Sequence, residues 1–435
     1  MSSKDPAFTF IDLFAGIGGF HAALSALGGE CVYASEIDEH AAKIYQNNWG
    51  LQPAGDIEAE VAGEMSVPEH DVLVGGFPCQ PFSKSGHQRG MEETRGTLFF
   101  SILEVLKVRR PGLVLLENVR NLAGPRHRHE WNVIVRELRT LGYRVSSHPA
   151  VFSPHLLPLE NGGRPQVRER VFIAATWVGG SGGDESPVVL NRPVVGWNPQ
   201  DWNLEAFRQS SENIDGGELN YGLSAREAKW IAAWTDFVAL LRADGVTRLP
   251  GFPIWADEFV LTDDLVLDDA MPIWKQDFLR KNAAFYTTHR VVIDKWLAAH
   301  DGLRGFPASR RKLEWQGQNA AGLEDCILQL RPSGIRAKRP TYAPALVAMT
   351  QTPVWNGRRR RMAPTEAASL QGLPVNFSFA GQDDKHTYRQ LGNGVNVGVV
   401  FHVLREQMRR SGPRWSAVAS AAPATPDAHF MDWRP

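Results

Sequence analysis

The feature that most constrains how this chain folds is an alternation of short apolar runs with stretches of helical spacing. Runs of strand length recur in order along the chain, at residues 8–14, 31–35, 71–75, 113–116, 145–151 and 170–175. Between them lie stretches with helical spacing, at residues 18–27, 39–49, 97–109 and 129–141. This alternation predicts strands joined by covering helices, and therefore an α/β, doubly wound, Rossmann-like domain built on a parallel sheet.

A glycine-rich stretch, GGSGGD at residues 179–184, ends this pattern and predicts a domain boundary. The segment that follows, 179–384, is irregular, and we expect a smaller second domain there. Its clearest helix begins at a capping box formed by Ser224 and Glu227. The apolar face of that helix predicts core packing rather than a binding stripe, and it consists of Trp230, Ile231, Trp234, Phe237, Val238 and Leu241. Residues 411–435 are rich in Ala, Ser and Pro, and we expect a disordered tail.

Composition narrows the class of protein. With 435 residues, of which 43% are hydrophobic and 22% charged, the chain is typical of folded proteins with two or three domains. No apolar stretch approaches the roughly 18 residues of a membrane span, and the N-terminus lacks a secretory signal. The three cysteines, Cys31, Cys79 and Cys326, are too few for a disulfide framework. We therefore expect a protein of a reducing cytoplasm, without membrane segments.

The formal charge of -1 conceals a strong segregation of charge along the chain. Acids outnumber bases by twelve to two over residues 1–71, and residues 255–270 carry six acids and no base. In contrast, residues 331–361 carry eight bases and no acid, and residues 107–144 carry nine bases against three acids. A single charge run is most often solvated surface, but two basic zones beside acidic ones indicate a molecule with one side that faces a polyanion.

Residues suited to binding a nucleoside follow the first predicted strands. Ligands of an open parallel sheet bind beyond the carboxyl ends of its strands. The first strand ends in a glycine turn that contains Phe14, Gly16 and Gly18, the second strand ends at Glu36, and Asp56 follows the next element. A glycine turn alone often serves only tight packing. Together with one acid placed for ribose hydroxyls and another for an adenine amine, it favours a nucleoside ligand. No Gly-Lys-Ser/Thr phosphate loop occurs, which disfavours ATP hydrolysis.

Two further strand ends carry groups suited to covalent and proton-transfer chemistry. Cys79 stands between Pro78 and Pro81, and prolines stiffen a loop so that a nucleophile keeps one position. A lone cytosolic cysteine is nevertheless more often a small buried hydrophobe. A later strand ends at Glu117, and a carboxyl group at a buried strand end can have a raised pKa and act as a proton donor. Taken alone, this residue fits a structural carboxylate equally well.

Five motifs occur in the order and approximate spacing of a known family. They are Phe14-x-Gly16-x-Gly18, Pro78-Cys79-Gln80, Glu117-Asn118-Val119, Gln166-x-Arg168-x-Arg170 and Gln390-x-Gly392-Asn393. Over about residues 8–177 and 361–405 the chain resembles the bacterial, stand-alone cytosine-5 DNA methyltransferases. The resemblance implies a Rossmann-like, S-adenosylmethionine-dependent methyltransferase domain at 1–178, completed by 385–410. It places a smaller, irregular target recognition domain at 179–384 by position alone.

The resemblance implies a covalent mechanism on cytosine. Cys79 would add to carbon 6 of a cytosine flipped out of duplex DNA, because carbon 5 is otherwise too electron-poor to attack a methyl donor. Glu117 would donate a proton at ring nitrogen 3. Arg168 would hold the base carbonyl, with Arg170 bracing Glu117. A methyl group would pass from S-adenosyl-L-methionine to carbon 5, leaving S-adenosyl-L-homocysteine, and no metal would be required.

The resemblance also implies how the cofactor is held. It assigns adenine stacking to Phe14, packing on the adenine to Ile37, the ribose to Glu36, the adenine amine to Asp56 with its neighbour Ile57, and the methionine end to Gly16, Gly18, Pro78 and Asn393. One departure from the family pattern is visible, since many members have Ser after that Asn where this chain has Gly394. A contact from the backbone could survive this change, but a hydroxyl contact could not.

For the DNA partner the sequence gives candidate residues and no recognition sequence. The candidates are basic or polar residues of the loop after Cys79 and of the basic stretches, namely Ser83, Lys84, Arg89, Arg310, Arg311, Arg336, Arg339, Arg358, Arg359, Arg360 and Arg361. The run of four arginines is expected to meet phosphates rather than bases. We expect double-stranded DNA as the partner of a monomeric enzyme in the bacterial cytoplasm, with a cognate restriction endonuclease that acts separately.

Four other functions fit the sequence less well. A cytidine deaminase needs Pro-Cys-x-x-Cys for zinc, and no Cys stands three residues after Cys79. A dinucleotide oxidoreductase would explain the glycine turn and Glu36 but not the Pro-Cys-Gln loop. The tRNA-methylating branch of the same family usually carries Cys-Phe-Thr, which is absent here. A silent DNA-binding regulator would not require the intact set of Cys79, Glu117, Arg168 and Arg170.

Overall fold

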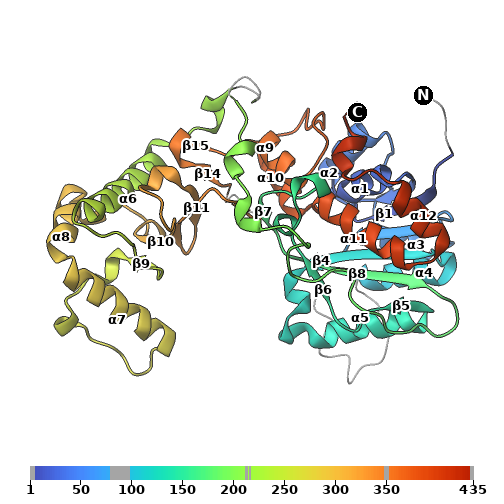
Figure 1. Ribbon diagram of the computed structural model, residues 1–435, viewed down its shortest axis with the longest axis horizontal. Coiled ribbons are helices and arrows are strands. Elements are labelled where there is room, and N and C mark those ends of the chain that lie inside the picture. The colour runs from blue at the N-terminus through green and yellow to red at the C-terminus, as the bar shows by residue number, and fades with distance from the viewer. Residues whose placement is uncertain (1–4, 79–97, 211–213, 215–216, 347–351, 432–435) are drawn as a thin grey trace. The chain divides into compact units, whose positions relative to one another are not determined.

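The computed structural model describes residues 5–78, 98–210, 214, 217–346 and 352–431, and the chain divides into two compact units (Figure 1). The larger unit comprises Met1–Trp202, Pro344–Met349 and Ala367–Pro435. The smaller unit comprises Asn203–Ala343 and Thr350–Glu366. The larger unit is thus assembled from separate parts of the chain, with boundaries at 202 and 367, where the sequence placed them at 178 and 385.

The larger unit is built on a seven-stranded sheet in the order β2-β1-β3-β4-β8-β5, with β6 also paired to β8. Its strands are β1 (Phe8–Leu13), β2 (Gly29–Ser35), β3 (Val72–Gly76), β4 (Leu113–Val119), β5 (Tyr143–Val145), β6 (Ala150–Phe152) and β8 (Arg170–Trp177). Neighbours among β1 to β4 are parallel, whereas β8 is antiparallel to β4, β5 and β6. The prediction of a largely parallel α/β sheet is confirmed.

One predicted strand is wrong in detail, because residues 145–151 form the end of β5 and the start of β6 rather than one strand. The intervening residues leave the sheet, since Pro149 has no N–H group to donate. The N–H group of Ser147 donates instead to Oδ1 of Asp184, at 2.7 Å. Both short strands therefore pair with the same neighbour, β8, at different points along it.

Helices cover both faces of this sheet. On one face, α3 (Ile57–Ala62), α4 (Leu98–Arg109) and α5 (Arg128–Thr140) share a hydrophobic cluster with Ile11 and Leu73. Strand side chains alternate between faces, and on the other face Phe10 lies 5.5 Å from His21 of α1 (Gly19–Ala26). The remaining helices of this unit are α2 (Glu39–Trp49), α10 (Asp384–Asn393), α11 (Val397–Arg410) and α12 (Pro413–Ala421), and α9 (Pro364–Gln371) spans the boundary between the units. Among the described residues, no helix is long and apolar enough to cross a membrane.

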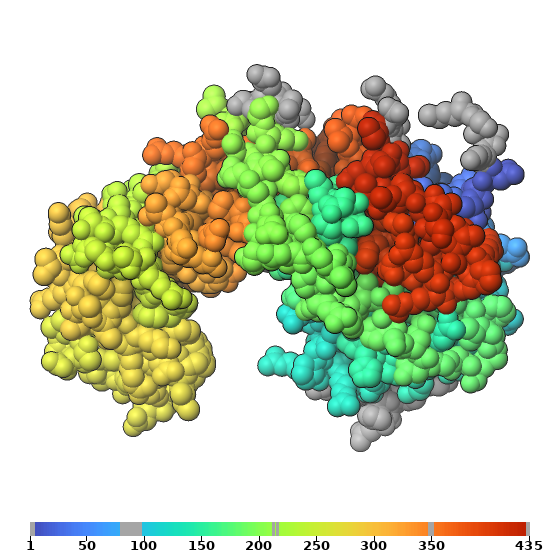
Figure 2. All heavy atoms as spheres, viewed as in Figure 1, coloured from blue at the N-terminus to red at the C-terminus, as the bar shows by residue number. Residues whose placement is uncertain are grey.

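The C-terminal segment, expected to be a disordered tail, is folded onto the larger unit as far as the structure describes it. The ring of Trp415 in α12 lies 5.9 Å from that of Phe8, and Nη2 of Arg164 donates to Oδ1 of Asp427 at 2.6 Å. In Figure 2 the C-terminal atoms (red) lie beside N-terminal atoms (blue) on the surface of this unit. The abundance of Ala, Ser and Pro indicated disorder, but a few large side chains anchor the segment.

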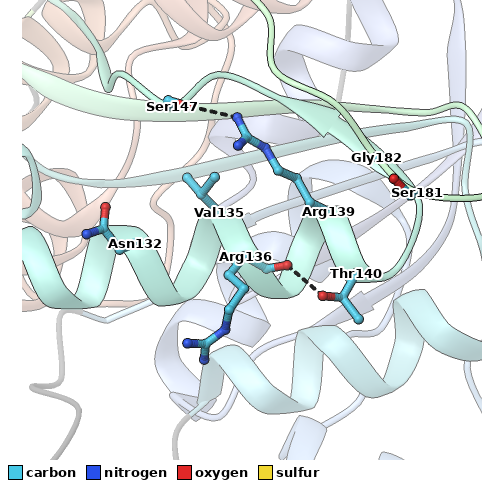
Figure 3. A pocket seen from close by; sticks show the side chains of 8 residues that line it. All are labelled: Asn132, Val135, Arg136, Arg139, Thr140, Ser147, Ser181 and Gly182. Carbon is cyan, nitrogen blue, oxygen red and sulfur yellow. Dashed lines mark hydrogen bonds between the residues drawn. The ribbon is translucent and has the colours of Figure 1, made fainter.

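The glycine-rich stretch 179–184, read from the sequence as a domain boundary, is a packed edge inside the larger unit, which continues to Trp202. A Cβ atom on Gly182 would lie 2.0 Å from the carbonyl oxygen of Tyr143, so close backbone packing requires glycine here. Nη2 of Arg139 donates to Oγ of Ser147 at 2.8 Å on the neighbouring segment (Figure 3). These residues border a cavity of about 460 Å³ over α5, which is lined by Asn132, Val135, Arg136, Arg139, Thr140, Ser147, Ser181 and Gly182.

The smaller unit holds a six-stranded sheet in the order β15-β14-β11-β12-β10-β9. Its elements are α6 (Ala225–Ala243), β9 (Ile254–Trp255), α7 (Ile273–Thr288), α8 (Arg290–Ala299), β10 (Lys312–Gln316), β11 (Ile327–Arg331), β12 (Gly334–Lys338), β14 (Val354–Trp355) and β15 (Arg360–Arg361), and β13 (Ala343–Pro344) lies at the boundary. The capping box of Ser224 and Glu227 is confirmed. Trp234 and Phe237 of α6 are buried in the core of this unit, so the predicted core face is confirmed as well.

Candidate active site

The turn after β1 brings Phe14 and Gly16 to the carboxyl edge of the large sheet. Phe14, Gly16 and Gly18 all have positive φ angles, of 58°, 55° and 90°. A left-handed backbone costs a non-glycine residue such as Phe14 of order 1–3 kcal/mol, and such residues cluster at functional sites. The N–H group of Ala15 donates to the carbonyl of Ser35 at 2.9 Å. The glycine turn is therefore joined to the end of β2, where the first candidate acid lies.

Glu36 connects these two strand ends. Its Oε2 accepts from the N–H of Gly16 at 2.7 Å, and its Oε1 accepts from the N–H of Asp38 at 2.8 Å. Each carboxylate oxygen can accept a second hydrogen bond, so Glu36 keeps the capacity to bind ribose hydroxyls. Burial raises the pKa of Glu36, and the backbone hydrogen bonds oppose this shift. Asp56 caps α3 by accepting from the N–H of Glu58 at 2.9 Å.

These residues surround one cavity of about 460 Å³. The expected cofactor residues that line it are Phe14, Gly16, Glu36, Ile37, Asp56, Ile57, Pro78 and Asn393. Gly18 does not line the cavity, because it faces Trp49, whose indole occupies the space of an added Cβ. An aromatic ring, two acids and a glycine turn around a cavity of this size fit the adenosine part of S-adenosylmethionine.

Glu117 and Arg170 meet at the wall of the same cavity. Glu117 lies near the end of β4 and is 7% exposed, and Nε of Arg170 at the start of β8 lies 2.9 Å from its Oε1. Burial raises the pKa of Glu117, and the positive charges of Arg170 and Arg168 oppose this shift. A carboxyl group with a raised pKa keeps its proton to higher pH, which suits it to donate that proton to a bound base.

Arg168 is placed away from the cavity, unlike the expectation for it. Its guanidinium group donates to the carbonyl of Leu346 at 3.0 Å and to that of Gly392 at 2.9 Å, and also to that of Gly394. Burial lowers its pKa to about 9. β7 (Gln166–Val167) and β8 belong to different sheets, so a spacing of two residues does not put both arginines on one face. Of these two arginines, Arg170 lines the cavity.

The expected nucleophile Cys79 lies outside the described residues, as do the candidate DNA contacts Ser83, Lys84 and Arg89. The described chain reaches Pro78, which lines the cavity. Nδ2 of Asn118 donates to the carbonyl of Phe77 at 2.9 Å and ties the end of β4 to the chain that leads to Pro78. The residue before Cys79 and the carboxyl group of Glu117 therefore border the same cavity.

The cavity has lining residues that the sequence did not single out, including Ser35, Asp38, Arg389 and Val395. Arg389 lies on α10 about one helical turn before Asn393, so helical spacing from the Gln-x-Gly-Asn motif could have indicated it. No comparable signal existed for Val395. It lies just after the end of α10 and lines the cavity because the chain leaves the helix at Gly394. Gly394 also lines the cavity and offers only its backbone, as its departure from the family pattern requires.

The run of four arginines in the smaller unit does not act as one phosphate-binding surface. Arg360 is 1% exposed, and both of its terminal nitrogens donate to Glu366 at 2.9 Å. Arg361 is ion-paired with Glu227. In the part of the chain that the structure describes, Arg358 and Arg359 are exposed and take part in no ion pair. The expectation that all four meet phosphate is wrong for Arg360, because its charge is used inside the unit.

The other arginines proposed for DNA contact are also partly engaged within the smaller unit. Nη1 of Arg310 donates to the carbonyl of Arg331 at 2.6 Å, and Nη1 of Arg311 lies 2.7 Å from Oδ1 of Asp257. Arg336 is paired with Glu314 at 2.9 Å. Arg339 is exposed and donates to the amide oxygen of Gln318 at 3.0 Å. Of the described candidates, Arg339, Arg358 and Arg359 are therefore the most accessible to a phosphate.

Four features around one cavity together define a class of protein. They are the doubly wound sheet, the glycine turn after β1, the acid after β2 and the buried carboxyl–arginine pair. That class is the Rossmann-like, S-adenosylmethionine-dependent methyltransferases.

Comparison with known proteins identifies the family. The C-5 cytosine-specific DNA methylase family matches residues 8–212 and 248–409. The chain is 44% identical to the type II methyltransferase M.AluI of Cellulosimicrobium cellulans over an alignment of 489 residues. This alignment covers 94% of each protein. It is 42% identical over 173 residues to the type II methyltransferase M.HhaI of Haemophilus parahaemolyticus, which covers 39% of this chain and 50% of that protein. The chain belongs to the C-5 cytosine-specific DNA methylase family, and it is a DNA (cytosine-5) methyltransferase.

Proposed function

We propose that this enzyme methylates carbon 5 of a cytosine flipped out of a specific duplex sequence, through a covalent adduct with Cys79. The observation that carries the proposal is that Glu117, Arg170 and Pro78, the residue before Cys79, line the cavity that also holds the cofactor-binding residues. Because the relatives M.AluI and M.HhaI are named type II methyltransferases, we assign the enzyme to a type II restriction–modification system. It acts in the bacterial cytoplasm as a monomer, with a cognate endonuclease that acts separately.

The first step is the addition of the Cys79 thiolate to carbon 6 of the cytosine. This carbon lies inside the base stack of duplex DNA, so the base has to leave the helix before the thiolate can reach it. Addition at carbon 6 pushes electron density toward carbon 5 and turns that carbon into a nucleophile. Pro78 and Pro81 flank the nucleophile and limit the positions that its sulfur can take.

Glu117 and Arg170 hold the base and balance its charge. As the thiolate adds, ring nitrogen 3 gains electron density, and the protonated carboxyl group of Glu117 donates its proton there. Arg170 borders the cavity beside Glu117, so we assign to it the contact with the base carbonyl that the sequence assigned to Arg168. Arg168 instead fixes the segment around Gly392 by its hydrogen bonds to backbone carbonyls.

Bound S-adenosylmethionine supplies the methyl group that carbon 5 takes up. Water then takes the proton from carbon 5, and the electrons of that C–H bond restore the double bond between carbons 5 and 6 as the Cys79 thiolate leaves. Nitrogen 3 returns its proton to Glu117. The residues that hold the cofactor for this step are Phe14 against the adenine, Glu36 at the ribose and Asp56 at the adenine amine, with Gly16 and Asn393 at the methionine end. None of these steps calls for a metal ion.

Incubation with labelled S-adenosylmethionine and duplex DNA tests the proposal. We expect label on DNA, and sequencing that detects 5-methylcytosine should place it at one short recurring sequence. A parallel reaction with tRNA serves as the control, because the tRNA-methylating branch shares the catalytic motifs. Label on tRNA and none on DNA would refute the proposed substrate, and methylation at cytosines in every context would refute sequence specificity.

A comparison of two arginine variants tests the revised assignment of the basic run. Replacing Arg358 and Arg359 by alanine should weaken binding to all DNA sequences alike and reduce the salt slope of binding by about 2, since each lost phosphate contact changes it by about 0.9. Replacing Arg360 by methionine should instead lower the free energy of unfolding by about 3–5 kcal/mol, because the buried carboxylate of Glu366 loses the positive charge that pairs with it. Salt titrations of DNA binding and urea unfolding measure the two effects. The assignment fails if the Arg360 variant is as stable as the wild type.

A further inference from the structure

The cofactor turn depends on a contact from outside itself. Phe14, Gly16 and Gly18 have left-handed backbones within five residues, and the turn contains one backbone hydrogen bond of its own, from Gly18 to Ala15 at 2.9 Å. The carbonyl of Ile17 accepts a hydrogen bond from Nε1 of Trp49 at 3.0 Å. A strained turn persists only where its surroundings over-determine it. Trp49 therefore contributes to holding the turn in the shape that lines the cavity.

The indole of Trp49 packs directly against the turn. It is the last residue of α2, and the helix stops there because Gly50 turns the chain with a φ of 72°. Its indole lies so close to the turn that a Cβ atom on Gly18 would be 2.0 Å from Nε1. A displacement of the indole would therefore free the space beside Gly18 and remove the hydrogen bond to Ile17 together.

Three aromatic side chains hold the indole in place. His21 stacks on it with ring centroids 4.4 Å apart, and Phe377 and Phe430 lie at 6.0 Å and 6.3 Å. Burial lowers the pKa of His21 to about 3, so this ring stays neutral and stacks as an aromatic side chain. Phe430 is the most distant of the three in sequence and belongs to the C-terminal segment, residues 412–431.

The C-terminal segment is anchored independently of Trp49. Gly412 starts it with a φ of 99°, and Arg414 is ion-paired with Asp71 at 2.9 Å. Further along, Asp427 is ion-paired with Arg164 at 2.6 Å. These ion pairs hold the segment so that Phe430 packs against the indole. Phe430 is 6% exposed. Figure 1 shows the same arrangement, with the C-terminal end of the chain beside α1 and α2 of the larger unit.

We propose that the C-terminal segment is an intramolecular strap that sets the position of the cofactor turn, through Phe430 and then Trp49. Both are positioning residues, because neither lines the cavity. The turn lines the cavity proposed for the cofactor, whereas Glu117 and Arg170 lie on β4 and β8. Loosening the strap therefore lowers the affinity for S-adenosylmethionine and leaves the chemical step unchanged once the cofactor is saturating. The inference goes beyond the proposed function and holds whether or not the reaction passes through a Cys79 adduct.

Two variants of the full-length protein test this inference by calorimetric titration with S-adenosylhomocysteine in the absence of DNA. Trp49→Phe keeps an aromatic ring but removes the N–H donor, and it should weaken binding about tenfold, as expected for one lost hydrogen bond. Phe430→Ala should weaken binding about threefold, because the binding-competent turn is less populated. The KM for S-adenosylmethionine should rise in parallel, with kcat at saturating cofactor within about twofold of the wild type.

Met431→Ala is the matched control, since Met431 is the next residue and is 81% exposed. The double variant should bind no more weakly than Trp49→Phe alone, because Phe430 acts through the bond that Trp49 makes. If Phe430→Ala is recovered unfolded, Phe430→Leu keeps an apolar contact and should show a smaller loss in the same direction. Wild-type affinity in Trp49→Phe and Phe430→Ala, an equal loss in Met431→Ala, or a lowered kcat with unchanged affinity would each overturn the proposal.

Discussion

Replacing Cys79 by alanine is expected to reduce kcat for methyl transfer by roughly 10⁴-fold or more, the usual size of the loss of a catalytic nucleophile. Without the thiolate, carbon 5 of cytosine stays too electron-poor to attack the methyl group. Affinity for S-adenosylhomocysteine should stay unchanged, because Cys79 itself is not among the residues assigned to the cofactor. Turnover with labelled S-adenosylmethionine and calorimetric titration measure the two quantities separately.

Cys326→Ala is the matched control for the thiol. Cys326 is 3% exposed in the smaller unit, and burial raises its pKa to about 12, so it supplies no thiolate near neutral pH. DNA that contains 5-fluorocytosine gives an independent test, because fluorine at carbon 5 cannot leave as a proton does. The wild type and Cys326→Ala should form a stable adduct with this DNA and Cys79→Ala should not. A Cys79→Ala enzyme with wild-type turnover would refute the covalent mechanism.

Replacing Glu117 by glutamine is expected to lower kcat by about 10²–10⁴-fold, the usual contribution of a general acid. The amide keeps a hydrogen-bond donor in the cavity, so the base can still be held, but no proton reaches ring nitrogen 3. Binding of 5-fluorocytosine DNA should persist while adduct formation slows. An unchanged kcat would show that the carboxyl group only supports the structure.

The raised pKa of Glu117 predicts the direction of a pH effect. A carboxyl group with a higher pKa in the folded than in the unfolded protein binds more protons when folded. Its contribution to stability is therefore fully present below the ordinary pKa of about 4.3 and is lost as the pH rises through the raised value. The active, protonated acid is lost over the same rise in pH. In the wild type we expect kcat/KM for DNA to fall as the pH rises through the raised pKa of Glu117. This fall at higher pH should be absent from the pH profile of Glu117→Gln.

The sequence predicted most residues that line the cavity, but it did not predict which of the two motif arginines lines it. Glycine turns and acids at strand ends can be located in a sequence, because the carboxyl ends of parallel strands meet at one edge of the sheet. Arg168 and Arg170 share a motif, yet Arg168, between β7 and β8, is buried among backbone carbonyls, whereas Arg170 lines the cavity. No local pattern distinguishes these two positions, since burial is decided by segments more than 170 residues further along the chain.

The run of four arginines likewise shows that a sequence does not reveal which charged side chains are buried. Four consecutive arginines look equivalent in a sequence, but the strand pairing of β14 with β15 turns Arg360 toward Glu366 and leaves Arg358 and Arg359 exposed. A charged residue is buried only with a partner, and Glu366 is six residues away on the following helix. The spacing was visible in the sequence, but the pairing was not.

Local order and chemistry followed from the chain alone: the alternation of strands and helices, the capping box at Ser224, the strand-end acids and the ordered motifs of the family. These features depend on neighbours in sequence, through backbone propensity and side-chain periodicity. Tertiary packing decided which groups face the cavity and whether residues 412–431 are ordered. A few long-range contacts, such as those of Trp415 with Phe8 and of Phe430 with Trp49, fold a segment whose composition indicated disorder. Composition averages over residues, whereas a packed structure is stabilised by particular ones.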